Sequence, residues 1–273
     1  MRKLTLFNSV SLVFGFAFLY IPILLLIIYS FNEGKNAAIW TGFSTKWYSE
    51  VFRNEQLLKA AWVTLRVGFL SASIATVLGT LAALTLTRFG RYRGSTLFNG
   101  MVYAPLVMPE IILGLALLLL FVAIDFERGF WTIVLAHITF TMCFATVVIQ
   151  SRLVTFDKSL EEAALDLGAP PWKTFFVITL PIILPAVISA WMLAFTLSID
   201  DLVISSFTTG PGATTLPMKI YSDVRLGVKP EINAVSTILV GIISCAVIAA
   251  SVVTKFGENR REKEAQAARK QVG

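Results

Sequence analysis

The chain has 273 residues, of which 56% are hydrophobic, and its mean hydropathy is +0.76. This composition indicates a membrane protein, because several apolar windows reach the roughly 20 residues needed to cross a hydrocarbon core of about 30 Å. The net charge of +6 is explained by basic segments on the cytoplasmic side, which are attracted to anionic lipid. The charge therefore does not support nucleic-acid binding, and we predict no nucleic-acid partner.

Apolar segments predict six transmembrane helices in a single domain, residues 1–273, and hence an all-α membrane protein embedded in the lipid bilayer. These lie at approximately Val10–Phe31, Trp62–Thr87, Met101–Ile124, Trp131–Gln150, Ile178–Ile199 and Val235–Lys255. The first segment follows basic residues as a secretory signal would. However, it is longer than a signal core and lacks a small-residue cleavage site, so we interpret it as a retained helix.

Lysine and arginine predict the orientation of the chain. They gather in alternate connections and at both ends, at Arg2, Lys3, Arg88, Arg91, Arg93, Arg152, Lys158, Lys173 and in a charged tail at about 256–273. The intervening loops carry basic residues diluted among acids. Because basic loops stay on the cytoplasmic side, both termini are predicted to be cytoplasmic.

A charged loop at about residues 155–181 interrupts the apolar segments and includes the run EAALDLGAPPWKTFFVITLP. Ser159 and Glu162 have the spacing of a capping box, which predicts a helix start. Gly168 stands where a helix can end in a left-handed turn, and two prolines after it prevent continuation. The pattern predicts a stiff helix of about two turns. These residues alone also fit an ordinary amphipathic connector between membrane helices.

Seven positions of this loop carry a family resemblance. They are Glu162, Ala163, Ala164, Gly168, Ile178, Leu180 and Pro181. At this spacing they resemble the motif by which the membrane subunit of a bacterial ATP-binding-cassette (ABC) importer binds its ATPase. The resemblance implies a type I ABC importer permease fold, with these residues coupling the chain to the ATPase. It also implies that the partner ATPase, and not this chain, binds ATP and magnesium.

No resident cofactor, metal or catalytic residue is predicted for the chain itself. Cys143 and Cys245 stand in separate apolar runs, and the single histidine, His137, is expected to form a hydrogen bond between helices. A phosphate-binding loop of the Gly-x-x-x-x-Gly-Lys-Ser/Thr type is missing from the sequence, so the chain is not expected to hydrolyse ATP or to be an enzyme.

Acidic residues within or beside the spans are the candidates for a substrate path, because a charge there is costly and usually functional. Glu110 lies near the middle of the third predicted span, whereas Asp200 and Asp201 end the fifth. Trp191, inside the fifth span, either faces the path or packs between helices. An excess of carboxylates favours a cationic solute. Alternatively, Glu110 pairs with an arginine of a partner subunit, and the aspartates sit at the outer interface.

Four segments narrow the resemblance: MPEIILGLALLLLF, FTLSIDDLVISSF, GPGATTLP and VRLGVKPEIN are similar to stretches of polyamine importer permeases. This implies a multi-pass subunit of the bacterial inner membrane that imports putrescine, with spermidine as a second solute. The implied partners are a second permease subunit, two copies of an ABC ATPase and a periplasmic polyamine-binding protein. The alternatives are a permease of the same fold for a metal ion, sulfate or thiamine, a proton-coupled secondary transporter, and a noncatalytic scaffold.

Overall fold

The computed structural model describes residues 6–34, 39–90, 92–227, 230–242 and 244–245. Contacts divide the chain into two compact units, Met1–Glu55 with Asp223–Gly273, and Gln56–Ser222. The predicted charged tail at 256–273 and the end of the sixth predicted span lie outside the described residues.

The described part of the chain is helical and carries one isolated bridge, between Asn32 and Phe43. Helical stretches that are long and apolar enough to cross a membrane are Phe7–Tyr29, Glu55–Arg88, Phe130–Val154 and Pro171–Ile199, and a bent pair adds a fifth span if it is counted as one. The predicted all-α membrane class is therefore confirmed. The sixth span stays a prediction, because the last apolar helix is described only over Pro230–Ile242. The sidedness of the termini also stays a prediction.

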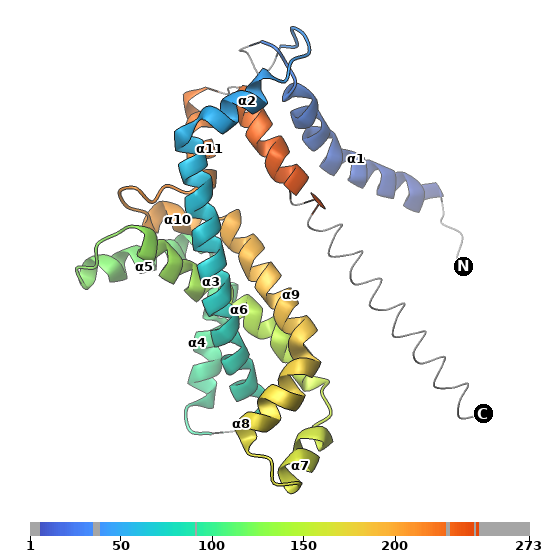
Figure 1. Ribbon diagram of the computed structural model, residues 1–273, viewed down its shortest axis with the longest axis vertical. Coiled ribbons are helices and arrows are strands. Elements are labelled where there is room, and N and C mark those ends of the chain that lie inside the picture. Colours follow the sequence, from blue (N-terminus) through green and yellow to red (C-terminus); the bar gives the residue numbers. More distant parts are fainter. Residues whose placement is uncertain (1–5, 35–38, 91, 228–229, 243, 246–273) are drawn as a thin grey trace. The chain divides into compact units, whose positions relative to one another are not determined.

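In the unit Gln56–Ser222, three long helices lie side by side: α3 (Glu55–Arg88), α6 (Phe130–Val154) and α9 (Leu180–Ile199) (Figure 1). The contact between α3 and α6 is close at Gly79, where an added Cβ would lie 2.9 Å from the Cβ of Ala145. Small residues allow this approach, and close van der Waals packing is what holds helices together in lipid.

The third predicted span is not one helix. It consists of α4 (Ser95–Val107) and α5 (Glu110–Ala123), which meet at 117°. Between them Met108 is extended, with φ −80° and ψ 136°, as expected for a residue that precedes proline. Pro109 has no N–H to continue the ladder of helix α4. The prediction of a continuous span over Met101–Ile124 was therefore wrong at this point, and Glu110 begins a helix instead of lying inside one.

The fifth predicted span begins earlier than the expected Ile178. Helix α8 (Pro171–Thr174) continues through a π-helical turn, η1 (Phe175–Thr179), into α9. After α9 the chain breaks at Asp200 and resumes as the short helix α10 (Val203–Thr208), which packs on α5 and α6. The two helix breaks, before α5 and before α10, thus lie in one packed region.

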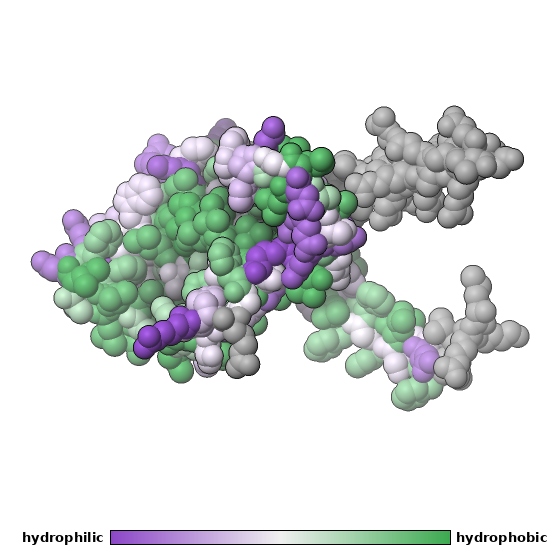
Figure 2. Space-filling view, turned by 90° about the horizontal axis from the view of Figure 1, so that it is seen from below, coloured by the Kyte–Doolittle hydropathy of each residue, from purple (hydrophilic) through white to green (hydrophobic). Residues whose placement is uncertain are grey.

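The other unit contains α1 (Leu6–Tyr29) and α2 (Lys46–Arg53), and α11 (Leu216–Leu226) runs across the boundary between the two units. Phe7, Phe14 and Phe18 of α1 are 77%, 71% and 72% exposed. Figure 2 shows apolar side chains over much of the face in view. Such surfaces are normal for helices surrounded by lipid or by partner helices, because lipid tails are as apolar as the side chains.

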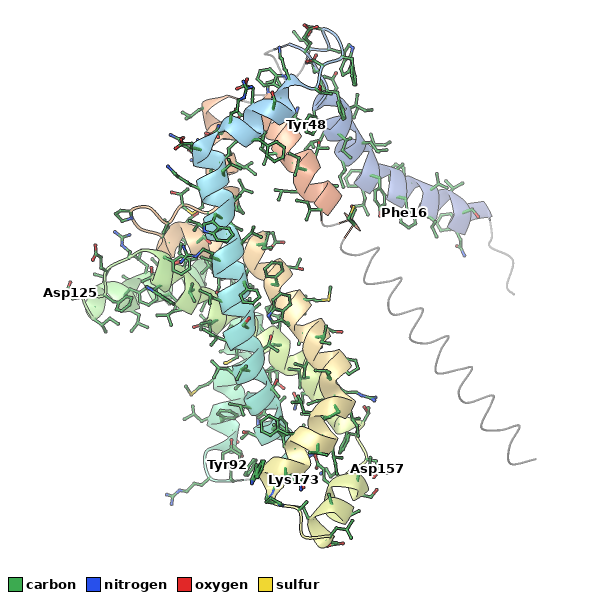
Figure 3. The ribbon with its side chains drawn as sticks, viewed as in Figure 1. Phe16, Tyr48, Tyr92, Asp125, Asp157 and Lys173 are labelled. Atoms are coloured by element: carbon green, nitrogen blue, oxygen red, sulfur yellow. The ribbon has the colours of Figure 1, made fainter. Side chains whose placement is uncertain are left out.

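Basic connections share one end of the unit Gln56–Ser222. Tyr92, Asp157 and Lys173, from the α3–α4 connection and from both parts of the loop at 155–181, lie there in Figure 3, whereas Asp125, between α5 and α6, lies away from it. The clustering agrees with the predicted grouping of basic segments on one side of the membrane.

Candidate functional site

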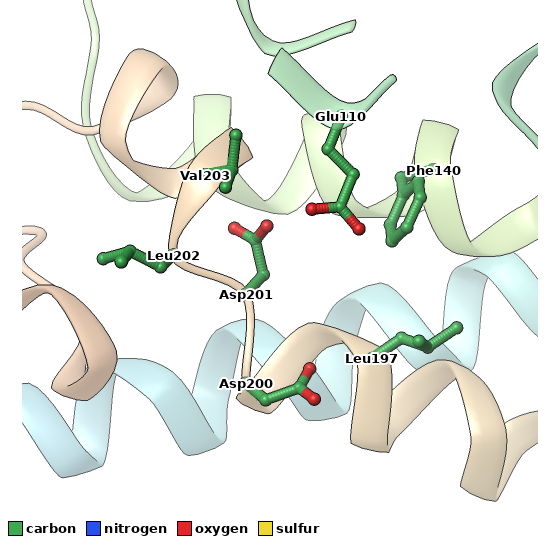
Figure 4. A pocket seen from close by; sticks show the side chains of 7 residues that line it. All are labelled: Glu110, Phe140, Leu197, Asp200, Asp201, Leu202 and Val203. Atoms are coloured by element: carbon green, nitrogen blue, oxygen red, sulfur yellow. The ribbon is translucent and has the colours of Figure 1, made fainter. Parts of the chain in front are cut away.

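A pocket of about 230 Å³ opens where the two helix breaks meet. It is lined by Glu110, Phe140, Leu197, Asp200, Asp201, Leu202 and Val203 (Figure 4). Glu110 is the first residue of α5, and Asp200 and Asp201 join α9 to α10. The structure therefore brings together three of the four residues predicted for the substrate path, although Glu110 is far from the two aspartates in the sequence.

Among the three acids, Asp201 is buried and its oxygens are occupied. Its Oδ1 accepts a hydrogen bond from the amide of Ile204 at 3.1 Å, and its Oδ2 accepts one from the amide of Ser205 at 2.7 Å. Nε2 of His137 lies 3.1 Å from the same Oδ2. Asp201 thus caps α10 and ties it to α6, which is a structural role that its position beside Asp200 does not reveal.

Glu110 and Asp200 are exposed at the pocket. Glu110 lies at the N-terminus of α5, where the helix dipole stabilises a negative charge. Asp200 is the C-cap of α9, where the dipole does not favour an anion. These two carboxylates are the groups of the pocket that could hold a cation.

Trp191 lies outside the pocket. Its Nε1 donates to Oγ of Ser73 at 3.1 Å, and its ring stacks on Phe195 with centroids 5.0 Å apart and meets Phe69 edge-on. The side chain therefore packs between α9 and α3. The sequence had left both a packing role and a path-facing role open for this residue, and the contacts support packing.

The loop at 155–181 forms α7 (Ser159–Asp166), the short helix that was predicted, and Gly168 follows it with a φ of +82°. The predicted capping box is wrong, since Ser159 is the first helical residue and the amide of Glu162 donates to the carbonyl of Lys158. Instead, Asp157 Oδ1 accepts from the Ser159 amide at 3.0 Å, and this bond lowers the pKa of the Asp157 carboxyl.

The seven motif residues divide into two groups by exposure. Glu162, Ala163, Gly168 and Pro181 are exposed, whereas Ala164, Ile178 and Leu180 are half-buried. Leu180 packs against a core of α3, α6 and α9 that includes Ala83, Ile149 and Ile183. One part of the motif thus offers a surface, and the other part joins that surface to the membrane helices.

Glu161, which sequence reasoning did not single out, holds the loop in place. Its Oε2 lies 3.0 Å from Nε of Arg88 at the end of α3, and its Oε1 accepts from Oγ1 of Thr179 at 2.6 Å. Both ionic side chains are less than a fifth exposed, at 17% for Arg88 and 18% for Glu161. The exposed neighbour, Glu162, remains accessible on α7.

Residues 75–261 match the family model described as binding-protein-dependent transport system inner membrane component. The chain belongs to this family. The match includes α7 and all the residues that line the pocket, so both regions described above are parts of the family's shared domain.

Known relatives of this permease have been assigned to polyamine transport. It is 52% identical over 267 residues to the putrescine transport system permease protein PotI of Escherichia coli K12, covering 96% of this chain and 95% of the relative. It is 44% identical over 240 residues to the spermidine/putrescine transport system permease protein PotC of the same strain, covering 88% and 90% of the two chains.

Solved structures agree in fold at low sequence identity. A chain of a bacterial ABC transporter that imports alginate superposes with a TM-score of 0.68 at 17% identity, covering 91% of this permease and 94% of that chain. A chain of the MetNI methionine ABC transporter gives a TM-score of 0.59 at 21% identity, covering 71% and 92%. The predicted ABC importer permease fold is confirmed, and the protein is a noncatalytic, multi-pass permease subunit of the bacterial inner membrane.

No group of three or more His, Cys, Asp or Glu in the described ranges of the permease is arranged to hold a metal ion. The pocket contributes charge and shape, and the loop contributes a protein surface.

Proposed function

We propose that this permease forms one half of the pore of an ATP-driven polyamine importer, with putrescine as its principal solute and spermidine as a second. The observation that carries the proposal is the pair of carboxylates, Glu110 and Asp200, exposed at one small pocket between two helix breaks. The names of the relatives at 52% and 44% identity support the same solute class.

The pocket suits a small cation by charge and by size. A diammonium compound can place one charged nitrogen against each carboxylate, and charge-assisted hydrogen bonds of this kind are stronger than neutral ones. The apolar lining at Phe140, Leu197 and Val203 fits the methylene chain between two such nitrogens. An anion such as sulfate would meet repulsion from the same two carboxylates.

The partners in this proposal are a second permease subunit, two ATPase copies and a periplasmic polyamine-binding protein. Permease subunits of ABC importers work with partner ATPases, and α7 with its exposed motif residues is the surface that we assign to the ATPase. One of the structural relatives was solved with an alginate pentasaccharide-bound periplasmic protein. ATP and magnesium would be bound by the ATPase alone.

The transport cycle that we infer is alternating access. Closure of the ATPase pair on ATP would draw the two coupling helices together and open the pore toward the binding protein. Release of the ATPase pair after hydrolysis would return the pocket to the cytoplasm. A proton-coupled transporter, by contrast, would lose uptake when the proton gradient is collapsed and ATP is maintained.

Uptake of labelled putrescine tests the proposal in cells from which this permease and redundant importers have been removed. Restoring the wild-type chain should restore uptake. We expect Glu110→Gln and Asp200→Asn each to lower the uptake rate on the order of tenfold, because each loses one charge-assisted contact with the solute.

Asp125→Asn is the matched control, since Asp125 is an exposed acid on the connection between α5 and α6 and does not line the pocket. Its uptake should equal that of the wild type at equal membrane abundance. Normal putrescine uptake by both pocket variants would contradict the proposed path, and failure of the wild type to restore uptake of either polyamine would contradict the solute assignment.

A further inference from the structure

A buried histidine lies directly behind the acidic pocket. His137 of α6 is 1% exposed, and its ring contacts both sides of the α9–α10 break. Nδ1 lies 2.6 Å from Oγ of Ser198 in α9, and Nε2 lies 3.1 Å from Oδ2 of Asp201 and 3.1 Å from Oγ of Ser205 in α10. One side chain thus joins three helices at the point where the pocket forms.

The contact with Asp201 determines which ring nitrogen carries a proton. A carboxylate can only accept hydrogen bonds, so Nε2 of His137 must be the donor. Oδ2 of Asp201 also accepts from the amide of Ser205, and Oδ1 accepts from the amide of Ile204. Every oxygen of Asp201 therefore has a protein donor, which leaves this carboxylate little capacity to hold a solute.

We propose that His137 is a positioning residue of the solute site, an inference that rests on the proposed function. By engaging Asp201, it holds the α9–α10 break in the conformation that presents Asp200 to the pocket opposite Glu110. It also withdraws the third carboxylate from the solute. The pocket then offers two free carboxylates, which matches the two ammonium groups of a linear diamine.

The residue type is important for this role. An apolar side chain at position 137 would leave Oδ2 of Asp201 with one donor fewer, and that oxygen would become a competing ligand for an ammonium group. A glutamine can still extend an N–H toward Asp201, whereas an asparagine is one methylene shorter and retains only the contact on the Ser198 side. His137→Gln, His137→Asn and His137→Leu therefore separate the Asp201 contact from simple filling of space.

The experiment uses the complete transporter in proteoliposomes, with both permease subunits, the ATPases and the binding protein loaded with labelled putrescine. The measured quantity is putrescine transported per ATP hydrolysed. We expect His137→Leu and His137→Asn to lower this ratio on the order of tenfold, the effect of losing one charge-assisted hydrogen bond, and His137→Gln to stay within about twofold of the wild type.

A purely structural role would reduce the amount of assembled transporter, and with it transport and ATP hydrolysis together, so the ratio would not change. An unchanged ratio in His137→Leu, or an equal loss in His137→Gln and His137→Asn, would overturn the proposal. If His137→Leu does not assemble, the Gln and Asn variants alone decide between these outcomes.

The pocket variants distinguish this inference from the proposed function. If Glu110→Gln and Asp200→Asn lose transport while all His137 variants keep the normal ratio, only the positioning role fails. If the wild-type transporter moves no putrescine, the proposed function fails and this inference fails with it.

Discussion

At the scale of single residues, the chain twice places two acids side by side and gives them opposite roles. Asp201 is buried and both of its carboxylate oxygens accept hydrogen bonds from the protein, whereas Asp200 is exposed at the pocket. Glu161 pairs with Arg88, whereas Glu162 is exposed on α7. In each pair one acid stabilises the fold, and the other remains available to a solute or to a partner.

Charge reversal at Glu162 tests the available member of the second pair. Glu162→Lys should lower putrescine uptake more than about tenfold while the protein remains in the membrane, because reversing a charge at a protein interface commonly costs about 2 kcal/mol or more. Asp166→Lys, at an exposed acid of the same helix outside the family motif, is the control. Uptake is measured at equal membrane abundance, and equal uptake by the two variants would contradict ATPase docking through Glu162.

At the scale of elements, helix breaks create the site and helix contacts hold it. The break before α5 follows from Pro109, and the break before α10 is stabilised by the cap that Asp201 provides. Helix α7 is linked to α3 and to η1 through Glu161. This linkage gives a movement of α7 a direct route to two membrane helices.

Exchange of the charges in the Arg88–Glu161 pair tests that route. Each single reversal, Arg88→Glu or Glu161→Arg, should destabilise the protein on the order of 3 kcal/mol, because it leaves two like charges close together where little water reaches them. The double variant should recover most of the stability and of the uptake. Thermal unfolding in detergent and uptake in cells measure the two effects. A double variant no better than the singles would show that the pair does not act as a unit.

Close packing of α3 on α6 predicts a stability effect at Gly79. The Cβ of Gly79→Val would lie 2.9 Å from the Cβ of Ala145 and 3.1 Å from the amide nitrogen of Thr146. Such overpacking should cost about 1–3 kcal/mol in thermal unfolding. Gly100→Val in α4 is the matched control, since an added Cβ there meets nothing within 4 Å. Equal unfolding temperatures for the two variants would mean that α3 and α6 can accommodate a larger side chain at position 79 without a loss of stability.

At the scale of the whole molecule, we expect the arrangement of basic connections to determine how the chain sits in the membrane. In the unit Gln56–Ser222, the α3–α4 connection and the loop at 155–181 lie at one end. The ATPase acts in the cytoplasm, so the proposed docking of α7 assigns that end to the cytoplasmic side of the membrane. The positive-inside rule gives the same assignment.

Reporter fusions test this orientation. A fluorescent protein that matures only in the cytoplasm should be active when fused after Gly273 or before Met1, and a periplasmic phosphatase at the same points should be inactive. The matched control is a fusion at Asp125, on the connection assigned to the periplasm, where the phosphatase should be active. The reverse pattern at either terminus would contradict an even number of spans with both ends inside.

Local spacing in the sequence by itself determined the helical membrane class, the short helix ending at a left-handed Gly168 and the presence of carboxylates within or beside the predicted spans. Such features depend on residues within one or two turns of one another. Tertiary structure alone decided which acid of each pair is held by contacts within the protein, because each of these acids lies far from its partner in the sequence. Asp201 is 64 positions from His137, and Glu161 is 73 positions from Arg88. Those pairs form only when helices pack, and no local pattern records which helices will meet.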